Sequence, residues 1–225
     1  MWLESLDDSA DQFERGGVSQ LGERVAGRLR QHADIWRANT SDPFVLRVLE
    51  HGLELPFEEG VYPLEHHATR NFIKDDDDLE WARGAVQELV THGAVVKWAD
   101  LVPELEAAGI PVGARPHLIM ELIVADKGAS TPDNRKRRLI HDCRYLNEHL
   151  QHWGFKLETL PDFVKCLERG DRLITIDIAS AYHHVEVALR HRTLLGFHLD
   201  GVDYVYAVLP FGLSVAASSP PSPPK

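Results

Sequence analysis

The chain has 225 residues, of which 44% are hydrophobic and 26% charged, and its formal net charge is −11. These values are typical of a globular protein with one large or two small domains and an ample core. No apolar run approaches the roughly 20 residues that cross a bilayer, and the N-terminal residues lack the order of a secretory signal. Cys143 and Cys166 do not form a C-x-x-C pair, so we expect neither a disulfide framework nor a cysteine zinc site. An intracellular protein, in the cytoplasm or the nucleus and without a membrane partner, is predicted.

The negative charge is concentrated in the first half of the chain. Residues 1–112 have a balance of −12, whereas residues 113–225 have a balance of +1 and contain a local basic cluster. The mean charge is therefore no argument against nucleic-acid binding by the second half. We expect an acidic, mainly helical region over 1–112 and a second folded region over 113–217. Residues 218–225 are rich in Ser and Pro, have no apolar content, and are expected to be disordered.

Three helices are predicted in the acidic half. Apolar residues at helical spacing predict a first helix that reaches about Trp36, and a second, short helix is expected over residues 43–51. The third follows the four aspartates at 75–78 and ends at Gly93, so anionic side chains lie at its positive end and a glycine lies past its negative end. Four aspartates in a row also suit a metal site. We favour the helix because its N-terminal charge already explains them.

Strands and one further helix are predicted in the second half. The apolar run 117–124 predicts a strand, and residues 137–141 predict its returning partner across a polar loop. Pro161 opens a helix that continues to Gly170, and the β-branched run 173–178 predicts the next strand. The dipeptide Asp200-Gly201 between two apolar runs is a strong signal of a hairpin turn.

Asp177 is the candidate for metal chemistry, because the apolar run 173–178 carries this one carboxylate. Such a strand is normally buried, and burying an unpaired carboxylate costs several kcal/mol. We therefore expect Asp177 at a strand end, where a cation or water satisfies it. Nucleotidyl transfer uses two divalent cations about 4 Å apart, and a carboxylate beside the backbone carbonyl of Ile178 suits Mg²⁺. The alternative is a strand-end aspartate that caps the following helix.

The basic segment between the two predicted strands could supply the fixed cations that phosphates need. Its members are Lys127, Arg135, Lys136, Arg137 and Arg138. The alternative for such a cluster is a solvated loop. Tyr182 and the turn at 210–212 could supply flat and rigid surfaces for a sugar and a template, although a tyrosine at this position also suits a core.

Two further features have ordinary explanations. His183 and His184 could suggest zinc, but no third ligand stands at a matching spacing and adjacent residues of a strand point apart. Cys143 and Cys166 are expected to be small buried apolar residues.

The order of these motifs resembles the reverse transcriptase (RNA-directed DNA polymerase) domain of retrotransposons. The likeness is good from about residue 115 to residue 216, and a weaker likeness begins near Trp36. It implies an α+β fold, with the fingers and a partial palm of a right-hand polymerase preceded by a mainly helical region. The matching residues are 138–147, then 177–185, then Gly196-Phe197 with Tyr204, and then Leu209-Pro210-Phe211-Gly212-Leu213-Ser214.

The resemblance also implies roles for individual residues. Asp177 resembles the first catalytic aspartate, which binds both Mg²⁺ ions together with the carbonyl of Ile178. Tyr182 resembles the aromatic residue beneath the sugar that rejects a 2′-hydroxyl. Arg138 and, less closely, Lys127 resemble the fingers residues that hold the triphosphate of the incoming dNTP.

The same resemblance places further residues near the template–primer. Phe211 and Gly212 correspond to the turn near the templating base and incoming nucleotide. Nucleic-acid contacts are expected from Pro210 of this turn and from the basic segment Arg135, Lys136 and Arg137. A structural role in the fingers is implied for Asp142, Arg144 and Asn147.

The chain departs from the family pattern after the turn at 209–214. No Tyr-x-Asp-Asp sequence occurs in it, and this motif would complete the two-metal site. We therefore expect a fragment of a retrotransposon reverse transcriptase, truncated before that motif and inactive alone. The alternative is a non-catalytic remnant of the same fold that binds RNA or a protein.

Overall fold

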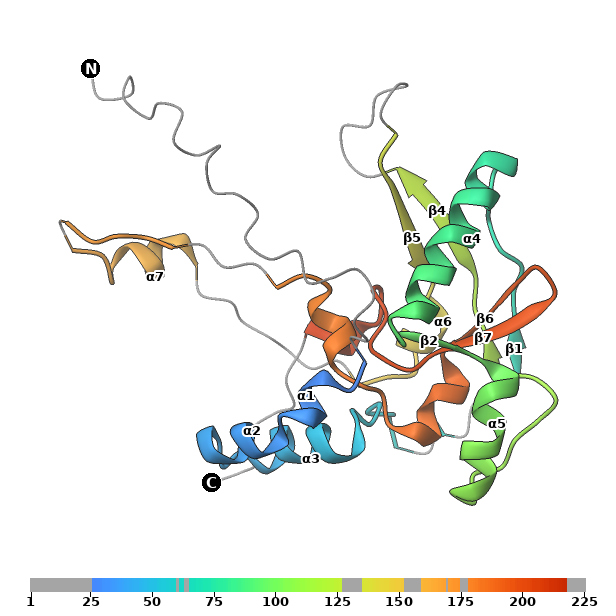
Figure 1. The fold of residues 1–225 in the computed structure, drawn as a ribbon, viewed down its shortest axis with the longest axis horizontal. Coiled ribbons are helices and arrows are strands. Elements are labelled where there is room, and N and C mark those ends of the chain that lie inside the picture. Colours follow the sequence, from blue (N-terminus) through green and yellow to red (C-terminus); the bar gives the residue numbers. More distant parts are fainter. Residues whose placement is uncertain are drawn as a thin grey trace.

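The computed structural model describes residues 26–59, 61–62, 65–126, 135–151, 159–168, 170–174 and 178–217. Its centre is a mixed five-stranded sheet in the order β1-β3-β6-β7-β2, beside a separate two-stranded sheet of β4 and β5 (Figure 1). The strands of the large sheet are β1 (His67–Ala68), β3 (Leu118–Ile119), β6 (Gly196–Leu199), β7 (Val202–Tyr206) and β2 (Val95–Lys97). Helices and sheets together confirm the predicted α+β class.

The large sheet takes strands from both halves of the chain. β1 pairs with β3 in parallel, and β2 pairs with β7 in antiparallel orientation. The first 112 residues therefore contribute two strands to the sheet as well as helices, and the proposed division at residue 112 stays a prediction.

The N-terminal helices begin with a difference from the sequence. The sequence predicts one long helix up to about Trp36, and residues 1–25 lie outside the described residues. Over the described residues the structure has two short helices, α1 (Arg28–Gln31) and α2 (Ala33–Asn39), which meet at His32. The second predicted helix is confirmed as α3 (Pro43–His51). Asp42 caps it by accepting hydrogen bonds from the backbone N–H groups of Phe44 and Val45, as the first unpaired amides of a helix require.

The helix after the four aspartates is confirmed as α4 (Asp76–Thr91). Asp75 is its N-cap and accepts a hydrogen bond of 2.8 Å from the backbone N–H of Asp78. A further helix, α5 (Trp98–Ala107), follows β2 directly and was not predicted. It buries Trp98, Leu101 and Leu105 against Val205 of β7 in a small core of its own.

The apolar run 117–124, predicted as one strand, is two strands in two sheets. β3 ends at Ile119, and β4 (Leu122–Asp126) pairs with the returning strand β5 (Arg137–His141). Between them, the backbone N–H of Met120 donates to the carbonyl of Gly196 in the large sheet. The apolar pattern does not reveal this change of sheet, because both strands bury residues of the same kind.

The hairpin at Asp200-Gly201 is confirmed. Both turn residues have positive φ, 49° for Asp200 and 79° for Gly201, which is the geometry that a two-residue hairpin turn requires. β6 and β7 pair on either side of it in antiparallel register. Gly196 at the start of β6 has no room for a side chain, because a Cβ there would lie 2.4 Å from the carbonyl oxygen of Leu118.

The prediction of a buried strand over 173–178 is wrong for its described residues. Leu173, Ile174 and Ile178 are 63%, 85% and 65% exposed, and none of them belongs to a strand. A strand needs a hydrogen-bonded neighbour and a covered face, and none of the described strands pairs with these three residues. Thr175, Ile176 and Asp177 lie outside the described residues.

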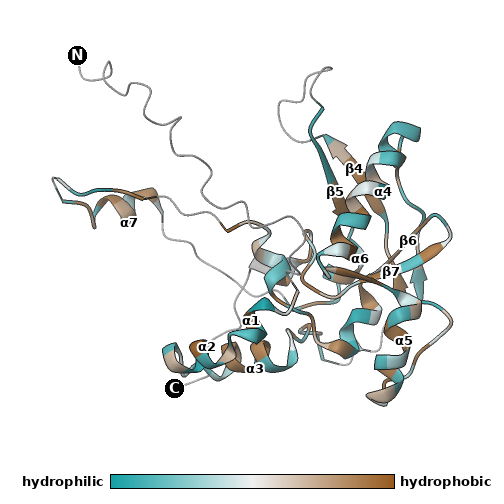
Figure 2. Cartoon of the chain, viewed as in Figure 1, coloured by the Kyte–Doolittle hydropathy of each residue, from teal (hydrophilic) through white to brown (hydrophobic). Residues whose placement is uncertain are grey.

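The remaining elements are short. α6 (Arg144–Asn147) follows β5, and the 3-10 helices are η2 (Ala181–His184), η3 (Leu189–Leu194) and η4 (Ser214–Ala217). The helix predicted from Pro161 is shorter than expected, as α7 (Leu160–Val164), and it lies away from the sheets (Figure 1). Apolar residues gather along the strands of the large sheet (Figure 2). Among the described helices, none combines the length and apolarity needed to cross a membrane.

Candidate nucleotide and nucleic-acid site

The turn at 210–212 is held by a residue from a distant motif. Asn147 donates a hydrogen bond of 2.8 Å from its Nδ2 to the carbonyl of Gly212. Its Oδ1 accepts one of 2.8 Å from the backbone N–H of Ser214. One amide side chain thus holds the last residue of the turn, Gly212, and Ser214, two residues beyond it.

The same turn needs glycine and presents an aromatic ring. Gly212 has a φ of 100°, and a Cβ there would lie 3.0 Å from the carbonyl oxygen of His141. Pro210 is buried, whereas Phe211 is half exposed. The turn is therefore fixed against β5 while the ring of Phe211 remains accessible.

Tyr182 lies against this turn. Its ring meets that of Phe211 edge to face, with centroids 5.2 Å apart and an interplanar angle of 83°. The ring of His183 also contacts Phe211, with centroids 6.0 Å apart. The structure therefore brings together Tyr182, Phe211 and Gly212, which the sequence analysis assigned to nucleotide binding.

His141 and Cys143 form the buried floor beneath the turn. Burial lowers the pKa of His141 to about 4, so the ring is neutral near pH 7. Its Nε2 lies 3.2 Å from the carbonyl oxygen of Gly196, and its Nδ1 lies 3.6 Å from Sγ of Cys143. Burial raises the pKa of the Cys143 thiol to about 12, which makes it an inert core group. The expected burial of Cys143 is confirmed.

Asp142 and Arg144 form a local ion pair beside this floor. The closest contact joins Arg144 Nη2 and Asp142 Oδ2 at 2.6 Å. Hydrogen bonding to the Arg144 guanidinium holds the pKa of Asp142 below its usual range. The pair therefore stabilises the start of α6, next to Asn147.

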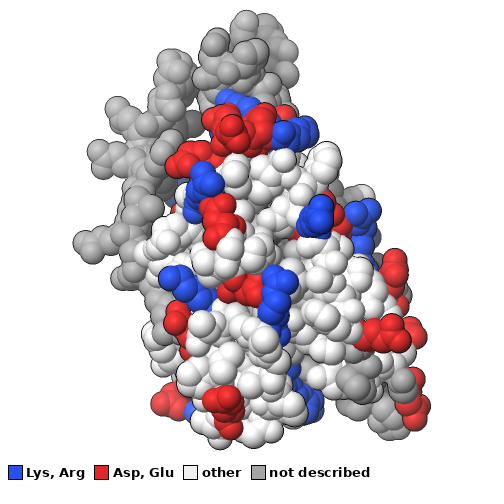
Figure 3. Space-filling model, turned by 90° about the vertical axis from the view of Figure 1, so that its right-hand side faces the viewer, with Lys and Arg blue, Asp and Glu red and all other residues white. Residues whose placement is uncertain are grey.

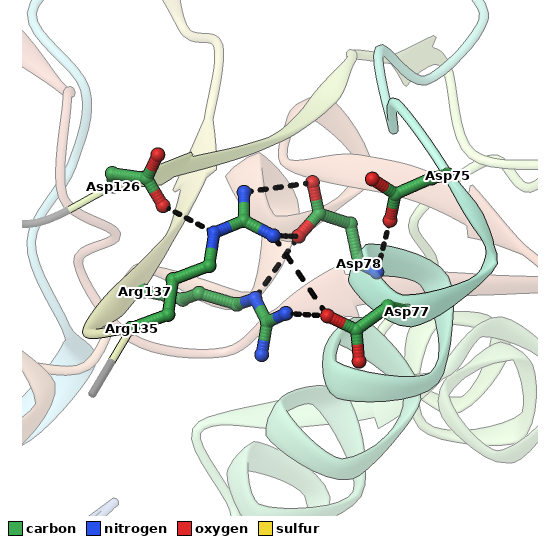
Figure 4. A network of polar contacts seen from close by, with 6 residues as sticks. All are labelled: Asp75, Asp77, Asp78, Asp126, Arg135 and Arg137. Carbon is green, nitrogen blue, oxygen red and sulfur yellow. Dashed lines mark hydrogen bonds and ion pairs between the residues drawn. The ribbon is translucent and has the colours of Figure 1, made fainter. Parts of the chain in front are cut away.

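The basic segment divides between two faces of β5. Arg135 and Arg137 turn toward the first turn of α4, where they bind Asp77 and Asp78, and Arg135 also binds Asp126 (Figure 4). Arg138 is exposed, and among the described residues it forms no ion pair. Basic and acidic side chains alternate on the face in Figure 3, without a continuous basic patch among the described residues there.

This pairing of α4 with β5 was missed by the sequence analysis. The signal was present as two runs of opposite charge, at 75–78 and at 135–138, but nothing in the sequence alone says that they meet. Nucleic-acid contact by Arg135, Lys136 and Arg137 stays a prediction. The guanidiniums of Arg135 and Arg137 have protein partners in this structure.

Of the two candidate metal ligands, Asp177 lies outside the described residues, and Ile178, which follows it, is exposed. Lys127, a candidate for triphosphate binding, also lies outside the described residues. Asp75, Asp77 and Asp78 form a group whose ligand atoms lie within 4.8 Å of one another. Two of these carboxylates already bind arginine, so the group is poorly suited to a divalent ion.

Two minor expectations need correction. His183 and His184 lie on η2 and not on a strand, because the chain turns there after Ser180, whose φ of 53° is left-handed. Cys166 is exposed, contrary to the expected burial, because it follows α7, which packs against neither sheet.

Comparison with known proteins agrees with the motifs. No family model matches the chain. Two curated relatives are Drosophila melanogaster proteins, the retrovirus-related Pol polyproteins from transposon 412 and from transposon gypsy. The first is 25% identical over 189 residues, 84% of this chain and 14% of the relative. The second is 31% identical over 96 residues, 43% of this chain and 9% of the relative. The chain therefore spans a small part of either polyprotein.

Solved structures show the same fold. The native protease-reverse transcriptase of prototype foamy virus has a TM-score of 0.50 at 12% identity, over 72% of this chain and 19% of the viral one. The CSH mutant of the same viral protein has a TM-score of 0.51 at 13% identity, over 84% of this chain and 25% of that chain. At this identity the likeness concerns the fold alone. Together, the comparisons show that this chain is similar in sequence to part of two retrotransposon Pol polyproteins and similar in fold to a viral protease-reverse transcriptase.

Proposed function

We propose that this chain forms the fingers and part of the palm of a retrotransposon reverse transcriptase and binds template–primer and dNTP. The proposal rests on one observation: Asn147 and Tyr182 both contact the turn at 210–212, although the three come from separate motifs. Asn147 is 65 residues from Gly212 in sequence and is hydrogen-bonded to it. A fold that assembles these motifs around an exposed aromatic ring supports a nucleotide-binding surface.

Each part of this surface has a proposed task. Arg138, on the exposed face of β5, holds the triphosphate together with Lys127, because guanidinium and ammonium groups bind phosphate oxygens. Tyr182 lies beneath the sugar. Phe211 and Gly212 contact the templating base and incoming nucleotide, and Pro210 stiffens the turn.

Mg²⁺ is the proposed metal. The carboxylate of Asp177 and the backbone carbonyl of Ile178 are hard oxygen donors of the kind that this ion prefers. When bound, a pair of such ions activates the attacking oxygen and stabilises the charge of the triphosphate. One carboxylate and one carbonyl do not complete the shells of two ions, and the 225 residues contain no Tyr-x-Asp-Asp. We therefore propose that these residues alone bind nucleic acid, in the cytoplasm or nucleus, without extending a primer.

A binding and extension experiment tests both parts of the proposal. Fluorescence anisotropy of a labelled RNA–DNA template–primer measures affinity at several salt concentrations, and primer extension with Mg²⁺ and dNTPs measures activity. We expect the wild-type chain to bind the template–primer. In Arg138→Ala, the slope of log affinity against log salt concentration should be smaller by about one unit, because one phosphate contact is removed. Arg47→Ala is the matched control, because Arg47 is an exposed arginine on α3, outside the proposed site.

Two results would contradict the proposal. Equal losses of affinity in the Arg47 and Arg138 variants would mean that binding depends on overall charge and not on β5. Incorporation of nucleotides by the purified chain would mean that the 225 residues hold a complete catalytic site.

A further inference from the structure

The carboxylate of Asp78 is fully buried. Asp78 is the third residue of α4 and is 0% exposed. A charge in such a place is strongly unfavourable unless ion pairs and hydrogen bonds replace its water. The helix N-terminus favours a negative charge, but only by a modest amount. The stability of this buried group therefore depends on its partners.

Two arginines provide those partners. Arg135 approaches with Nη1 2.7 Å from Oδ1 and Nη2 3.3 Å from Oδ2 of Asp78, and Nε of Arg137 lies 3.0 Å from the same Oδ1 (Figure 4). Each guanidinium also binds a second carboxylate. Arg135 Nε donates to Asp126 at 2.7 Å, and Arg137 Nη2 donates to Asp77.

These contacts join three elements. Asp126 ends β4, Arg135 precedes β5 and Arg137 begins it, while Asp77 and Asp78 belong to α4. Asp126 and Arg137 are also direct partners in the register of the β4–β5 pair. The network therefore fixes one end of this two-stranded sheet, where β4 ends and β5 begins, against the helix.

The direction of Arg138 follows from this arrangement. Successive side chains of a strand point to opposite faces, so a strand whose Arg137 is held toward α4 presents Arg138 on the other side. The exposure pattern of β5 agrees, because Arg137 is partly buried and Arg138 exposed.

We propose that Asp78 is a positioning residue that acts through Arg135 and Arg137 to hold Arg138 toward the phosphates of bound nucleic acid or nucleotide. The proposal rests on the function proposed above. It assigns the acidic start of α4 a part in nucleic-acid binding that its charge alone would not suggest.

The opposite behaviour would be competition, in which Asp77 and Asp78 keep the two arginines from phosphate. Burial argues against it. A phosphate that took over either arginine would leave Asp78 buried with fewer partners, and an uncompensated buried charge costs several kcal/mol. On this inference the two arginines stay bound to Asp78 instead of making the nucleic-acid contact predicted for them from the sequence, and Arg138 contacts the ligand.

Template–primer binding by the whole chain tests the inference with charge-matched variants. Asp78→Asn removes one negative charge, which by itself would strengthen binding to nucleic acid slightly. We expect about tenfold weaker binding instead, corresponding to about 1.4 kcal/mol. Asp34→Asn makes the same charge change at a side chain that is 98% exposed on α2, and we expect its affinity to stay within about twofold of the wild type.

Arg135→Lys and Asp77→Asn keep the test valid if Asp78→Asn fails to fold. Lysine preserves the charge of Arg135 but lacks the fork that reaches Asp78 and Asp126 together, so we expect weaker binding from this variant too. Asp77 is 76% exposed at its side chain, and Asp77→Asn removes one contact of Arg137 with little risk to folding. Binding equal to or tighter than that of Asp34→Asn in these variants would overturn the inference and favour competition.

A double-mutant cycle separates positioning from a general structural role. If Asp78 acts through Arg138, Asp78→Asn combined with Arg138→Ala should bind about as weakly as Arg138→Ala alone. Fully additive losses would overturn the inference.

Amide hydrogen exchange of the free chain tests the positioning step without any ligand. We expect faster exchange in β4 and β5 of Asp78→Asn than in Asp34→Asn, and unchanged exchange would overturn the inference. If the wild type fails to bind template–primer, the proposed function fails, while this measurement still decides whether Asp78 holds β5.

Discussion

The start of α4 and the described residues of the run 173–178 have opposite surroundings. Asp78 is fully buried and bonded to two guanidiniums from another part of the chain. The described neighbours of Asp177 on either side, Ile174 and Ile178, are mostly exposed and belong to no strand. From the sequence, Asp78 is expected at the start of a helix and Asp177 at the end of a buried strand.

The difference shows that local pattern does not determine whether a charged or an apolar side chain is buried. In the run at 75–78, Asp75 caps α4 by accepting a hydrogen bond from the backbone N–H of Asp78. Asp78, three residues later, is buried because β5 brings arginines to it. An apolar run such as 173–178 becomes a strand only where another strand pairs with it.

The largest expected effect is the loss of the buried carboxylate. Asp78→Ala leaves Arg137, whose side chain is 12% exposed, without its buried partner. Loss of one member of a buried ion pair costs about 3–5 kcal/mol, so we expect urea unfolding to show a loss of this order. Asp34→Ala is the exposed control, with an expected change below about 0.5 kcal/mol. Similar changes in both variants would mean that Asp78 is no more buried in solution than Asp34.

A second test uses pH and His191, which is buried on η3 against the rings of Phe57 and Tyr62. Burial lowers the pKa of His191 to about 4, and its Nδ1 accepts a hydrogen bond of 2.9 Å from the backbone N–H of Leu55. The unfolded chain binds the proton below about pH 6.5 while the folded chain does not. Stability is therefore complete above pH 6.5 and falls as the pH drops toward 4, by about 2 kcal/mol for this group between pH 7 and pH 5.

His191→Asn should reduce that dependence. The asparagine oxygen can accept from Leu55 but does not titrate, so urea unfolding of the variant should lose about 2 kcal/mol less than the wild type between pH 7 and pH 5. His51→Asn, at an exposed histidine of α3, should retain the wild-type dependence. An unchanged pH dependence in His191→Asn would show that His191 titrates alike in the folded and unfolded chains.

A smaller effect is expected at the turn of the candidate site. Asn147→Ala removes the hydrogen bonds to the carbonyl of Gly212 and from the N–H of Ser214. Because water reaches this side of the turn in part, the expected loss of unfolding free energy is about 1 kcal/mol. Asn39→Ala, at the exposed end of α2 and outside the turn, should lose less than about 0.5 kcal/mol. Template–primer affinity should fall in Asn147→Ala and not in Asn39→Ala. Equal affinities of the two variants would mean that the turn takes no part in binding.

The smallest expected effect concerns the segment before Asp177. Ile174→Ala should change the unfolding free energy by less than about 0.5 kcal/mol, because Ile174 is 85% exposed. Ile119→Ala is the buried counterpart at 1% exposure, with an expected loss of about 2–5 kcal/mol. A loss of that size at Ile174 would restore the buried strand that the sequence predicts.

Much of the fold was predictable where the cause is local. The boundaries of α3 and α4 follow from Asp42, Asp75 and the residues that end them, since capping involves neighbours in sequence. The β6–β7 hairpin follows from Asp200-Gly201 for the same reason. α5 was not predicted, and its burial depends on Val205, about a hundred residues away.

The candidate site was predictable in its members and not in its contacts. The motifs named Tyr182, Phe211, Gly212 and Arg138, and the structure brings the first three together. The hydrogen bonds from Asn147 to the turn were not foreseen, because they join residues 65 positions apart. The ion pairs of Arg135 and Arg137 were not foreseen either.

By itself, the sequence determined the α+β class, the positions of α3, α4 and the β6–β7 hairpin, and the resemblance to reverse transcriptases. Caps, turns and motifs act over a few residues, so their chemistry can be read along the chain. Only the tertiary structure decided that the run 117–124 divides between two sheets, that Asp78 is buried against two arginines, and that residues 173, 174 and 178 are exposed. These outcomes depend on which distant segments pack together, and a charge or an apolar run specifies a need for a partner without specifying which partner meets it.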